Sequence, residues 1–89
     1  MHPSHEDQIS RINKIEGQVK GIRKMIEDQR YCIDIVSQIR APIAALKKVE
    51  KNVLEKHLQH CVKEAMENKN PFELQEKISE IMQVISKMS

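Results

Sequence analysis

Residues 36–66 read VSQIRAPIAALKKVEKNVLEKHLQHCVKEAM, and this stretch decides the fold. Apolar residues recur from Val36 to Met66 at steps of three and four, with a single step of five from Val53 to Leu58, and no glycine interrupts them. This period predicts one amphipathic α-helix of about 35 residues, roughly 50 Å long. Pro42 is the only residue that opposes it, because proline removes a backbone donor and crowds the preceding turn. We therefore expect a kink near Ile39 rather than an end.

A shorter amphipathic helix is expected on each side of this segment. The first follows an acidic start at Glu6 and Asp7 and ends at the polar sequence Asp28-Gln29-Arg30. The third follows Asn68-Lys69-Asn70-Pro71, which closes the long helix. The first apolar stripe comprises Ile9, Ile12, Ile15, Val19, Ile22 and Ile26, and the third comprises Leu74, Ile78, Ile81, Met82 and Ile85. No segment predicts a strand, so we expect an all-α chain of three helices with a long central helix.

Length and composition favour a single domain, residues 1–89, because 39% hydrophobic side chains supply only one small core. The two aromatic residues, Tyr31 and Phe72, are too few for a module that stacks bases on aromatic side chains. No apolar run approaches the roughly 20 residues of a membrane span, and no signal peptide is visible, which predicts a cytoplasmic protein without a membrane partner. The sequence contains neither a recognisable nucleophile with its base nor a pair of catalytic acids, so we do not expect an enzyme.

The long helix is also expected to require a second chain. Flanking helices of about 22 and about 16 residues cover only part of a 35-residue helix, which leaves part of its apolar stripe bare. The simplest solution is an antiparallel dimer whose long helices form a four-helix bundle, with further association into a dimer of dimers. Gly17 and Gly21, one turn apart, indicate either a close approach of a neighbouring backbone or two tolerated surface glycines.

Cys32, His57 and Cys61 are predicted to share one face of the long helix. His57 and Cys61 follow Cys32 by 25 and 29 positions. At about 100° per residue, both return to within about 20° of the direction of Cys32 around the helix axis. Along the axis, however, Cys32 and His57 are about 37 Å apart, so one metal ion cannot contact both in one chain. In an antiparallel dimer with its two-fold axis near residues 45–46, Cys32 of one chain meets His57 and Cys61 of the other. Two equivalent sites per dimer follow.

The ligand set itself indicates the metal. Two thiolates and one imidazole form a soft three-coordinate set that suits Cu(I). Zn(II) is the alternative and would want a fourth ligand, such as water or His60. His2 and His5 could supply ligands from the N-terminus, although solvated histidines are the simpler expectation there. Without a metal, the two cysteines would be small core residues and His57 an ordinary surface imidazole.

Four stretches resemble the copper-sensing operon repressor (CsoR-like) family, which also contains nickel/cobalt-, formaldehyde- and persulfide-responsive members. They are RINKIEGQVKGI (11–22), YCID (31–34), the segment from Gln38-Ile39 to Ala44-Ala45-Leu46, and HLQHCV (57–62). Members that respond to Cu(I) have Cys, His and Cys where this chain has Cys32, His57 and Cys61. Nickel/cobalt members carry His at the last position, persulfide sensors lack the His, and formaldehyde sensors lack the second Cys.

The resemblance implies a repressor that binds operator DNA as a homotetramer, a dimer of dimers, and is released when Cu(I) binds. It also implies a tyrosine and a third-helix glutamate beside the ligands, which here are Tyr31 and Glu80. The segment after Cys61 is longer than in the family, so Glu76 is the alternative carboxylate. Pro42 also departs from the family pattern.

Basic residues of the first two helices are the candidate DNA contacts. They are Arg11, Lys14, Lys20, Arg23 and Lys24, followed by Lys47, Lys48 and Lys51. Because the net charge is only +2 and glutamates are interspersed, solvated charged faces are the alternative. The resemblance points to Arg11 and Lys48, and with their neighbours Lys14 and Lys47 they form the predicted DNA-binding set.

Two rival functions use the same residues. A persulfide-responsive repressor would join Cys32 and Cys61 in an interchain bridge and would not need His57. A copper storage or carrier bundle would hold Cu(I) without binding DNA.

Overall fold

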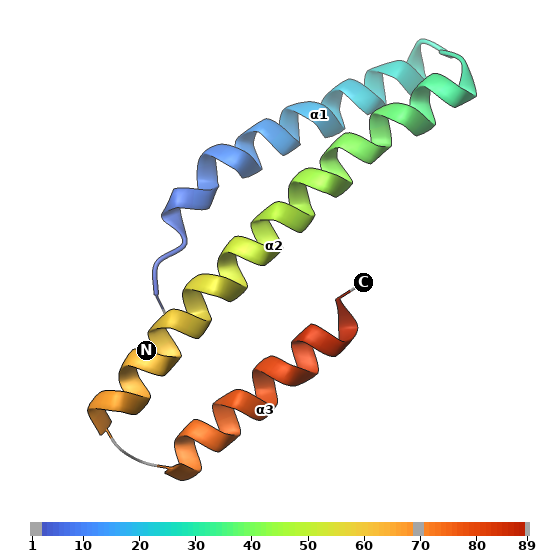
Figure 1. Ribbon diagram of the computed structural model, residues 1–89. Coiled ribbons are helices and arrows are strands. Elements are labelled where there is room, and N and C mark those ends of the chain that lie inside the picture. The colour runs from blue at the N-terminus through green and yellow to red at the C-terminus, as the bar shows by residue number, and fades with distance from the viewer. Residues whose placement is uncertain (1–2, 69–70, 89) are drawn as a thin grey trace. The chain divides into compact units, whose positions relative to one another are not determined.

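A computed structural model of the chain describes residues 3–68 and 71–88. These residues form one 3-10 turn, η1 (Glu6–Gln8), and three α-helices, namely α1 (Ile9–Glu27), α2 (Cys32–Asn68) and α3 (Pro71–Lys87) (Figure 1). No strand occurs in the described ranges. The all-α fold class with three helices and a long central one is therefore confirmed.

The first helix begins with the expected signals but through a tighter turn. The Ser4 hydroxyl accepts a hydrogen bond from the backbone N–H of Glu6 at 3.3 Å, which satisfies one of the unpaired amides at the start. Glu6 and Asp7 place negative charge at the same end, where the helix dipole favours it. The 3-10 turn then leads directly into α1.

The turn between α1 and α2 contains a residue in the left-handed conformation, Gln29, with φ of 55°. The backbone N–H of Arg30 donates to the carbonyl of Met25 at 2.9 Å, and that of Gln29 donates to Ile26 at 3.1 Å. This reversal satisfies carbonyls at the end of α1, in a position that usually holds glycine. The break predicted at Asp28-Gln29-Arg30 is therefore confirmed.

Pro42 lies inside α2 and is buried, and the helix continues through it. The helix has 37 residues, close to the expected length. Its first hydrogen bond runs from the N–H of Ile35 to the carbonyl of Tyr31 at 3.1 Å. Pro42 thus does not end the helix.

The chain divides into two compact units, of which the first is Ser4–Asn52. It contains α1 lying antiparallel to the first part of α2 (Figure 1). Ile15 of α1, with 6% of its surface exposed, forms its core together with the buried Pro42. Gly17 and Gly21 are exposed, and no described atom of the chain would come within 4 Å of a Cβ added at either.

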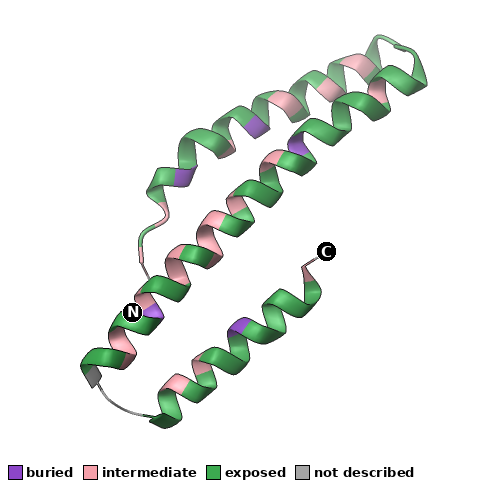
Figure 2. Cartoon of the chain, in the orientation of Figure 1, coloured by how far each residue is buried: buried purple, intermediate pink, exposed green. Residues whose placement is uncertain are grey.

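The second unit contains α2 from Val53 onward and the antiparallel α3. Its core consists of Cys61 and Ile81, which are 2% and 5% exposed (Figure 2). Among the described residues, no large side chain of either unit is fully buried. In a single chain, much apolar surface therefore stays exposed to water and does not contribute to stability through burial.

A continuous apolar stripe on the first part of α2 shows this most clearly. Its members are Val36, Ile39, Ile43 and Leu46, which are 38–49% exposed. They follow one another at steps of three and four, so they lie on one side of the helix. This uncovered stripe agrees with the expectation that α2 packs against another chain.

No helix within the described residues combines the length and apolar character needed to cross a lipid bilayer.

Candidate metal centre and nucleic-acid interface

Cys61 is the most enclosed of the three predicted metal ligands. It lies in the second unit, next to Ile81 among the few buried side chains, while His57 one turn earlier is half-buried. Because residues four apart are neighbours on a helix surface, α2 presents an imidazole and a thiol on successive turns of one face. These two groups form one half of the predicted site.

An ion pair defines the register between α3 and this part of α2. The Lys77 Nζ atom lies 2.7 Å from Glu64 Oε2. Since the two helices are antiparallel, each residue back along α2 is level with one residue further along α3. Counting from the ion pair, Cys61 is about level with Glu80, and Glu76 is about level with Ala65, further from Cys61.

Glu64 also faces His60, the predicted fourth ligand for Zn(II). His60 Nε2 lies 3.3 Å from Glu64 Oε1. The hydrogen bond from Lys77 lowers the pKa of the Glu64 carboxyl and raises the pKa of the Lys77 amine. Glu64 is therefore a carboxylate at neutral pH and is hydrogen-bonded to Lys77, whereas His60 Nε2 makes no hydrogen bond among the described residues.

Cys32 and Tyr31 lie in the first unit, at the start of α2. Cys32 is exposed, and Tyr31 is 68% exposed. Within the described part of one chain, no three His, Cys, Asp or Glu side chains are grouped so as to hold a metal ion. Among the N-terminal histidines, His5 is half-buried and His2 lies outside the described residues.

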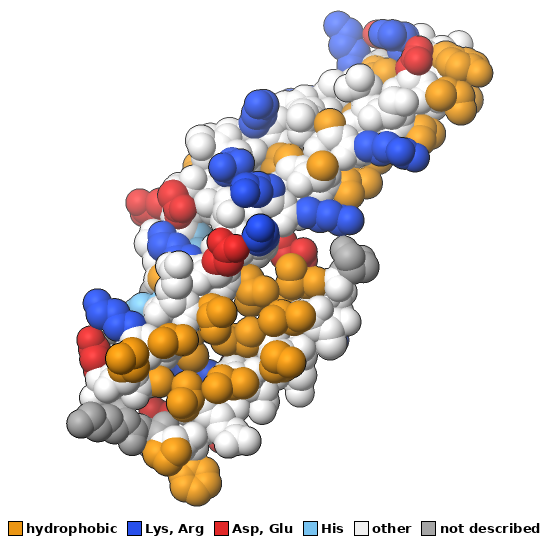
Figure 3. Space-filling model, in the orientation of Figure 1, with side chains coloured by type: hydrophobic (Ala, Val, Ile, Leu, Met, Phe, Trp, Pro, Cys, Tyr) orange, Lys and Arg blue, Asp and Glu red, His pale blue; other side chains and the backbone are white. Residues whose placement is uncertain are grey.

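The basic residues predicted to bind DNA are all exposed and all lie in the first unit. Arg11 and Lys14 are on α1, and Lys47 and Lys48 are on α2. Figure 3 shows lysine and arginine side chains over α1 and the first part of α2. Because these cations are exposed to solvent, they are accessible to phosphate groups.

A polar contact that the sequence did not reveal joins η1, which leads directly into α1, to α2. The Asn52 Nδ2 group donates a hydrogen bond to Gln8 Oε1 at 3.1 Å. Gln8 Nε2 in turn donates to Asp7 Oδ2 at 3.0 Å. Gln8 itself is only 7% exposed, although glutamine is usually found at the surface.

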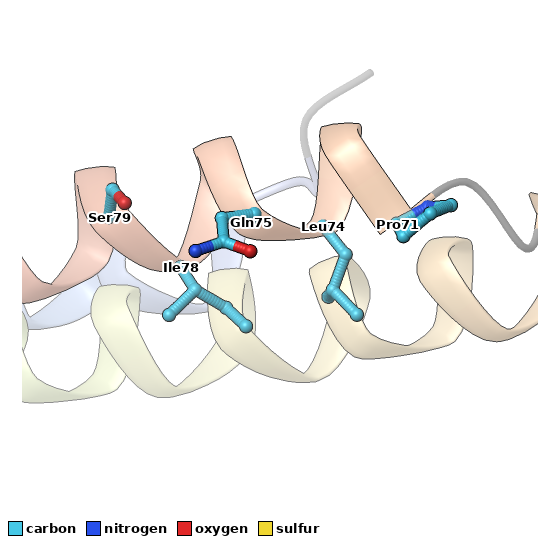
Figure 4. Close-up of a pocket in the computed structure, with 5 residues that line it drawn as sticks. All are labelled: Pro71, Leu74, Gln75, Ile78 and Ser79. Atoms are coloured by element: carbon cyan, nitrogen blue, oxygen red, sulfur yellow. The ribbon is translucent and has the colours of Figure 1, made fainter.

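A groove of about 340 Å³ lies along α3. It is lined by Pro71, Leu74, Gln75, Ile78 and Ser79, and Figure 4 shows Leu74 and Ile78 pointing to the opposite side of the helix from Ser79. None of these side chains is titratable. The groove therefore has none of the ligand chemistry found at His57 and Cys61, and it belongs to the apolar surface that Figure 3 shows over α3.

Fold and candidate site together define a class of protein: a small all-helical chain with two cysteines and a histidine, the predicted metal ligands, on a long helix, and exposed basic residues on its first two helices. The comparison with known families gives the particular group. Residues 4–87 match the metal-sensitive transcriptional repressors, and the chain belongs to this family.

Individual relatives agree with this assignment. The copper-sensing transcriptional repressor CsoR of Bacillus subtilis strain 168 is 44% identical over 85 residues, covering 94% of this chain and 81% of the relative. The copper-sensing transcriptional repressor RicR of Mycobacterium tuberculosis H37Rv is 48% identical over 61 residues, covering 68% of this chain and 64% of the relative. These findings confirm the predicted family and a transcriptional regulator rather than an enzyme.

Solved structures agree as well. The crystal structure of the copper-sensing repressor CsoR with Cu(I) from Geobacillus thermodenitrificans NG80-2 is 41% identical in sequence, with a TM-score of 0.83 over 98% of this chain and 92% of that one. The nickel-responsive transcriptional regulator InrS has a TM-score of 0.79 at 23% identity over 98% of this chain and 94% of that one, and it supports the fold alone.

Proposed function

We propose that this protein is a Cu(I)-responsive transcriptional repressor that binds operator DNA without metal and is released when Cu(I) binds. The observation that carries the proposal is the donor set of α2, which has the two thiols Cys32 and Cys61 and the imidazole of His57. Soft sulfur ligands select Cu(I) over hard cations. The names of the relatives, two copper-sensing repressors and a CsoR solved with Cu(I), support the same metal.

The metal site is formed by two chains. Cys32 and His57 belong to the same helix and are 25 residues apart, which at the rise of an α-helix is about 37 Å. An antiparallel neighbour brings Cys32 of one chain to His57 and Cys61 of the other. The exposed stripe from Val36 to Leu46 supplies the apolar surface that such a dimer would bury.

Two further side chains complete the surroundings of the ligands. Tyr31 directly precedes Cys32, and its exposed ring can reach a neighbouring chain. The register defined by Lys77 and Glu64 favours Glu80 over Glu76 as the carboxylate nearest to Cys61. Such partners orient ligands and tune a metal site without touching the metal.

Cu(I) is favoured over Zn(II) by the number and softness of the predicted ligands, two thiolates and one imidazole. A zinc site with two thiolates and one imidazole would normally take a fourth ligand, and His60 is the nearest histidine in the sequence. Its Nε2 atom lies 3.3 Å from the Glu64 carboxylate, which is already hydrogen-bonded to Lys77. That nitrogen makes no hydrogen bond within the described residues, so His60 stays available as a fourth ligand and Zn(II) stays the alternative.

DNA is bound by the exposed basic residues Arg11, Lys14, Lys47 and Lys48, repeated in each chain of a dimer of dimers. Metal binding can weaken DNA binding only if Cu(I) binds the DNA-free arrangement more tightly. Coupling of about 1–3 kcal/mol, typical of such systems, corresponds to roughly a 5- to 150-fold change in DNA affinity.

A DNA-binding titration of the parent protein tests the proposal. Fluorescence anisotropy with the DNA upstream of its own gene should show tight binding of the reduced apo-protein and release on addition of Cu(I), but not of Zn(II). X-ray absorption of the Cu(I) form should show a three-coordinate site with two sulfurs and one nitrogen.

The same titration separates the alternatives. Release by a persulfide donor but not by Cu(I) would identify a thiol-based sensor. Tight Cu(I) binding without any DNA binding would identify a storage or carrier protein. Tight four-coordinate Zn(II) binding that Cu(I) cannot displace would show that the protein is a zinc protein.

A further inference from the structure

Gln8 is the one polar side chain that is buried among the described residues, at 7% exposure. Its amide oxygen accepts a hydrogen bond from Asn52 of α2, and its amide nitrogen donates to Asp7. The bond is part-buried, since Asn52 is half-buried, and losing it would leave the buried Gln8 amide oxygen without this partner. The contact therefore has a defined geometry, which apolar side chains packed between two helices do not impose by themselves.

The hydrogen bond defines how far α1 is shifted along α2. Because the helices are antiparallel, each residue forward from Gln8 is level with one residue back from Asn52. Arg11 is then level with Val49, and Lys48 is level with the residue after Arg11. These two basic residues thus lie within about 1.5 Å of the same level along the helix pair, one turn from the hydrogen bond.

The packing below the hydrogen bond agrees with this register. The same counting places Ile15 level with Ala45, and Ile15 is buried while Ala45 is half-buried. Pro42, one turn further along, is buried as well. The core of this unit, at Ile15 and Pro42, therefore lies two to three turns along the helix pair from Gln8 and Asn52, in the same direction as the exposed Arg11 and Lys48.

We propose that Gln8 and Asn52 are positioning residues that hold Arg11 and Lys48 at the spacing needed to contact the DNA backbone. This inference rests on the proposed DNA-binding function. The cations supply the attraction to phosphate, whereas the hydrogen-bonded amides of Gln8 and Asn52 determine that cations from two different helices reach the DNA together. Without the pair, the helices can shift against each other, and one cation of each chain no longer reaches its phosphate.

The test uses Gln8→Ala, Asn52→Leu and the double variant, with Asn52→Gln as a conservative variant that keeps the donor. Gln83→Ala, which removes an exposed amide from α3, is the matched control. DNA affinity is measured on the full-length apo-protein at several salt concentrations. Circular dichroism confirms the helical fold, and Cu(I) affinity is measured by competition with a chelator.

The expected result is a loss of about tenfold in apo-protein DNA affinity for each single variant, with a salt slope smaller by about 0.9 for each phosphate that the protein no longer neutralises. The double variant should bind DNA no more weakly than the weaker-binding single variant, because both substitutions remove the same hydrogen bond between Gln8 and Asn52. Asn52→Gln should regain most of the affinity. Cu(I) affinity should stay within about twofold of the parent in all of them.

A purely structural role would lower the melting temperature but leave the affinity and salt slope of the folded protein unchanged. Parental affinity and slope in folded Gln8→Ala and Asn52→Leu would therefore overturn the inference. If Gln8→Ala does not fold, the two Asn52 variants decide the question. If the parent itself does not bind DNA, the proposed function is lost and this inference with it.

Discussion

Under the proposed function, replacing Ile43 by glutamate is expected to separate the proposed antiparallel dimer and thereby abolish the proposed copper site. Ile43 is 49% exposed in the single chain and lies in the middle of the uncovered stripe of α2. Burying a whole isoleucine side chain contributes about 1.5–3 kcal/mol, so the half that is still exposed contributes about 0.7–1.5 kcal/mol. The two-fold axis doubles this to about 1.5–3 kcal/mol per dimer, before the cost of enclosing two carboxylates.

A loss of about 3 kcal/mol raises the dissociation constant of the dimer by roughly a hundredfold. Sedimentation equilibrium measures that constant, and a chelator competition measures Cu(I) affinity on the same samples. Ala41→Glu is the matched control, because Ala41 is exposed and lies about 200° round α2 from Ile43. The reasoning is refuted if Ile43→Glu sediments like the parent, or if it dissociates yet still binds Cu(I) with parental affinity.

Three further predictions concern the site and the fold. The His57→Ala variant should retain much of its Cu(I) affinity through the two thiolates but lose Cu(I)-dependent release from DNA, whereas Cys32→Ala should lose Cu(I) affinity itself. Paired DNA-binding and metal titrations check this. Full release of DNA by His57→Ala would favour a thiol-only mechanism. The lowered pKa of Glu64 means that its ion pair with Lys77 stabilises the protein above pH 4.5, and that this contribution is lost as the pH falls through the lowered pKa. Because the pKa of Lys77 is raised, the same contribution to stability extends to at least pH 10.5. The difference in unfolding free energy between the parent and Lys77→Met should therefore be constant from about pH 6 to 9 and shrink in acid. Urea unfolding measures this difference, and a constant difference down to about pH 3 would contradict the prediction. Gln29→Gly should raise the unfolding free energy by about 0.5–1 kcal/mol, because glycine adopts positive φ without steric cost, and an unchanged denaturation midpoint would show that Gln29 is not strained.

Most of the fold could be predicted because it depends on periodicity. The apolar stripes give the number, type and approximate ends of the helices, and the structure confirms all three. The turn at Gln29 was predicted in place but not in conformation, since the residue with positive φ is a glutamine where glycine would be the usual signal. For Gly17 and Gly21, the structure shows open space within the described part of the chain, which leaves a neighbouring chain as the source of any close approach.

The candidate site was less accessible to sequence reasoning. Periodicity shows which face of a helix a residue occupies, but the level at which two helices meet depends on individual side chains. The bonds of Asn52 with Gln8 and of Lys77 with Glu64 define those levels, and neither pair is periodic or close in sequence. The choice between Glu80 and Glu76 therefore depends on the level at which α3 meets α2, which periodicity does not give, and it stays a prediction. The roles of Cys32, His57 and Cys61 stay predictions, because they involve a second chain.

The continuity of α2 has a genetic consequence under the proposed function. One uninterrupted helix carries Cys32 near its beginning and Cys61 near its end, so each site draws on opposite ends of two different polypeptides. A cell that expresses Cys32→Ala and Cys61→Ala chains together would form hybrid dimers containing one complete ligand set and one that lacks both thiols. Two alleles that are each blind to copper would then complement each other, and half of the sensing capacity of such a hybrid would be restored without any reversion.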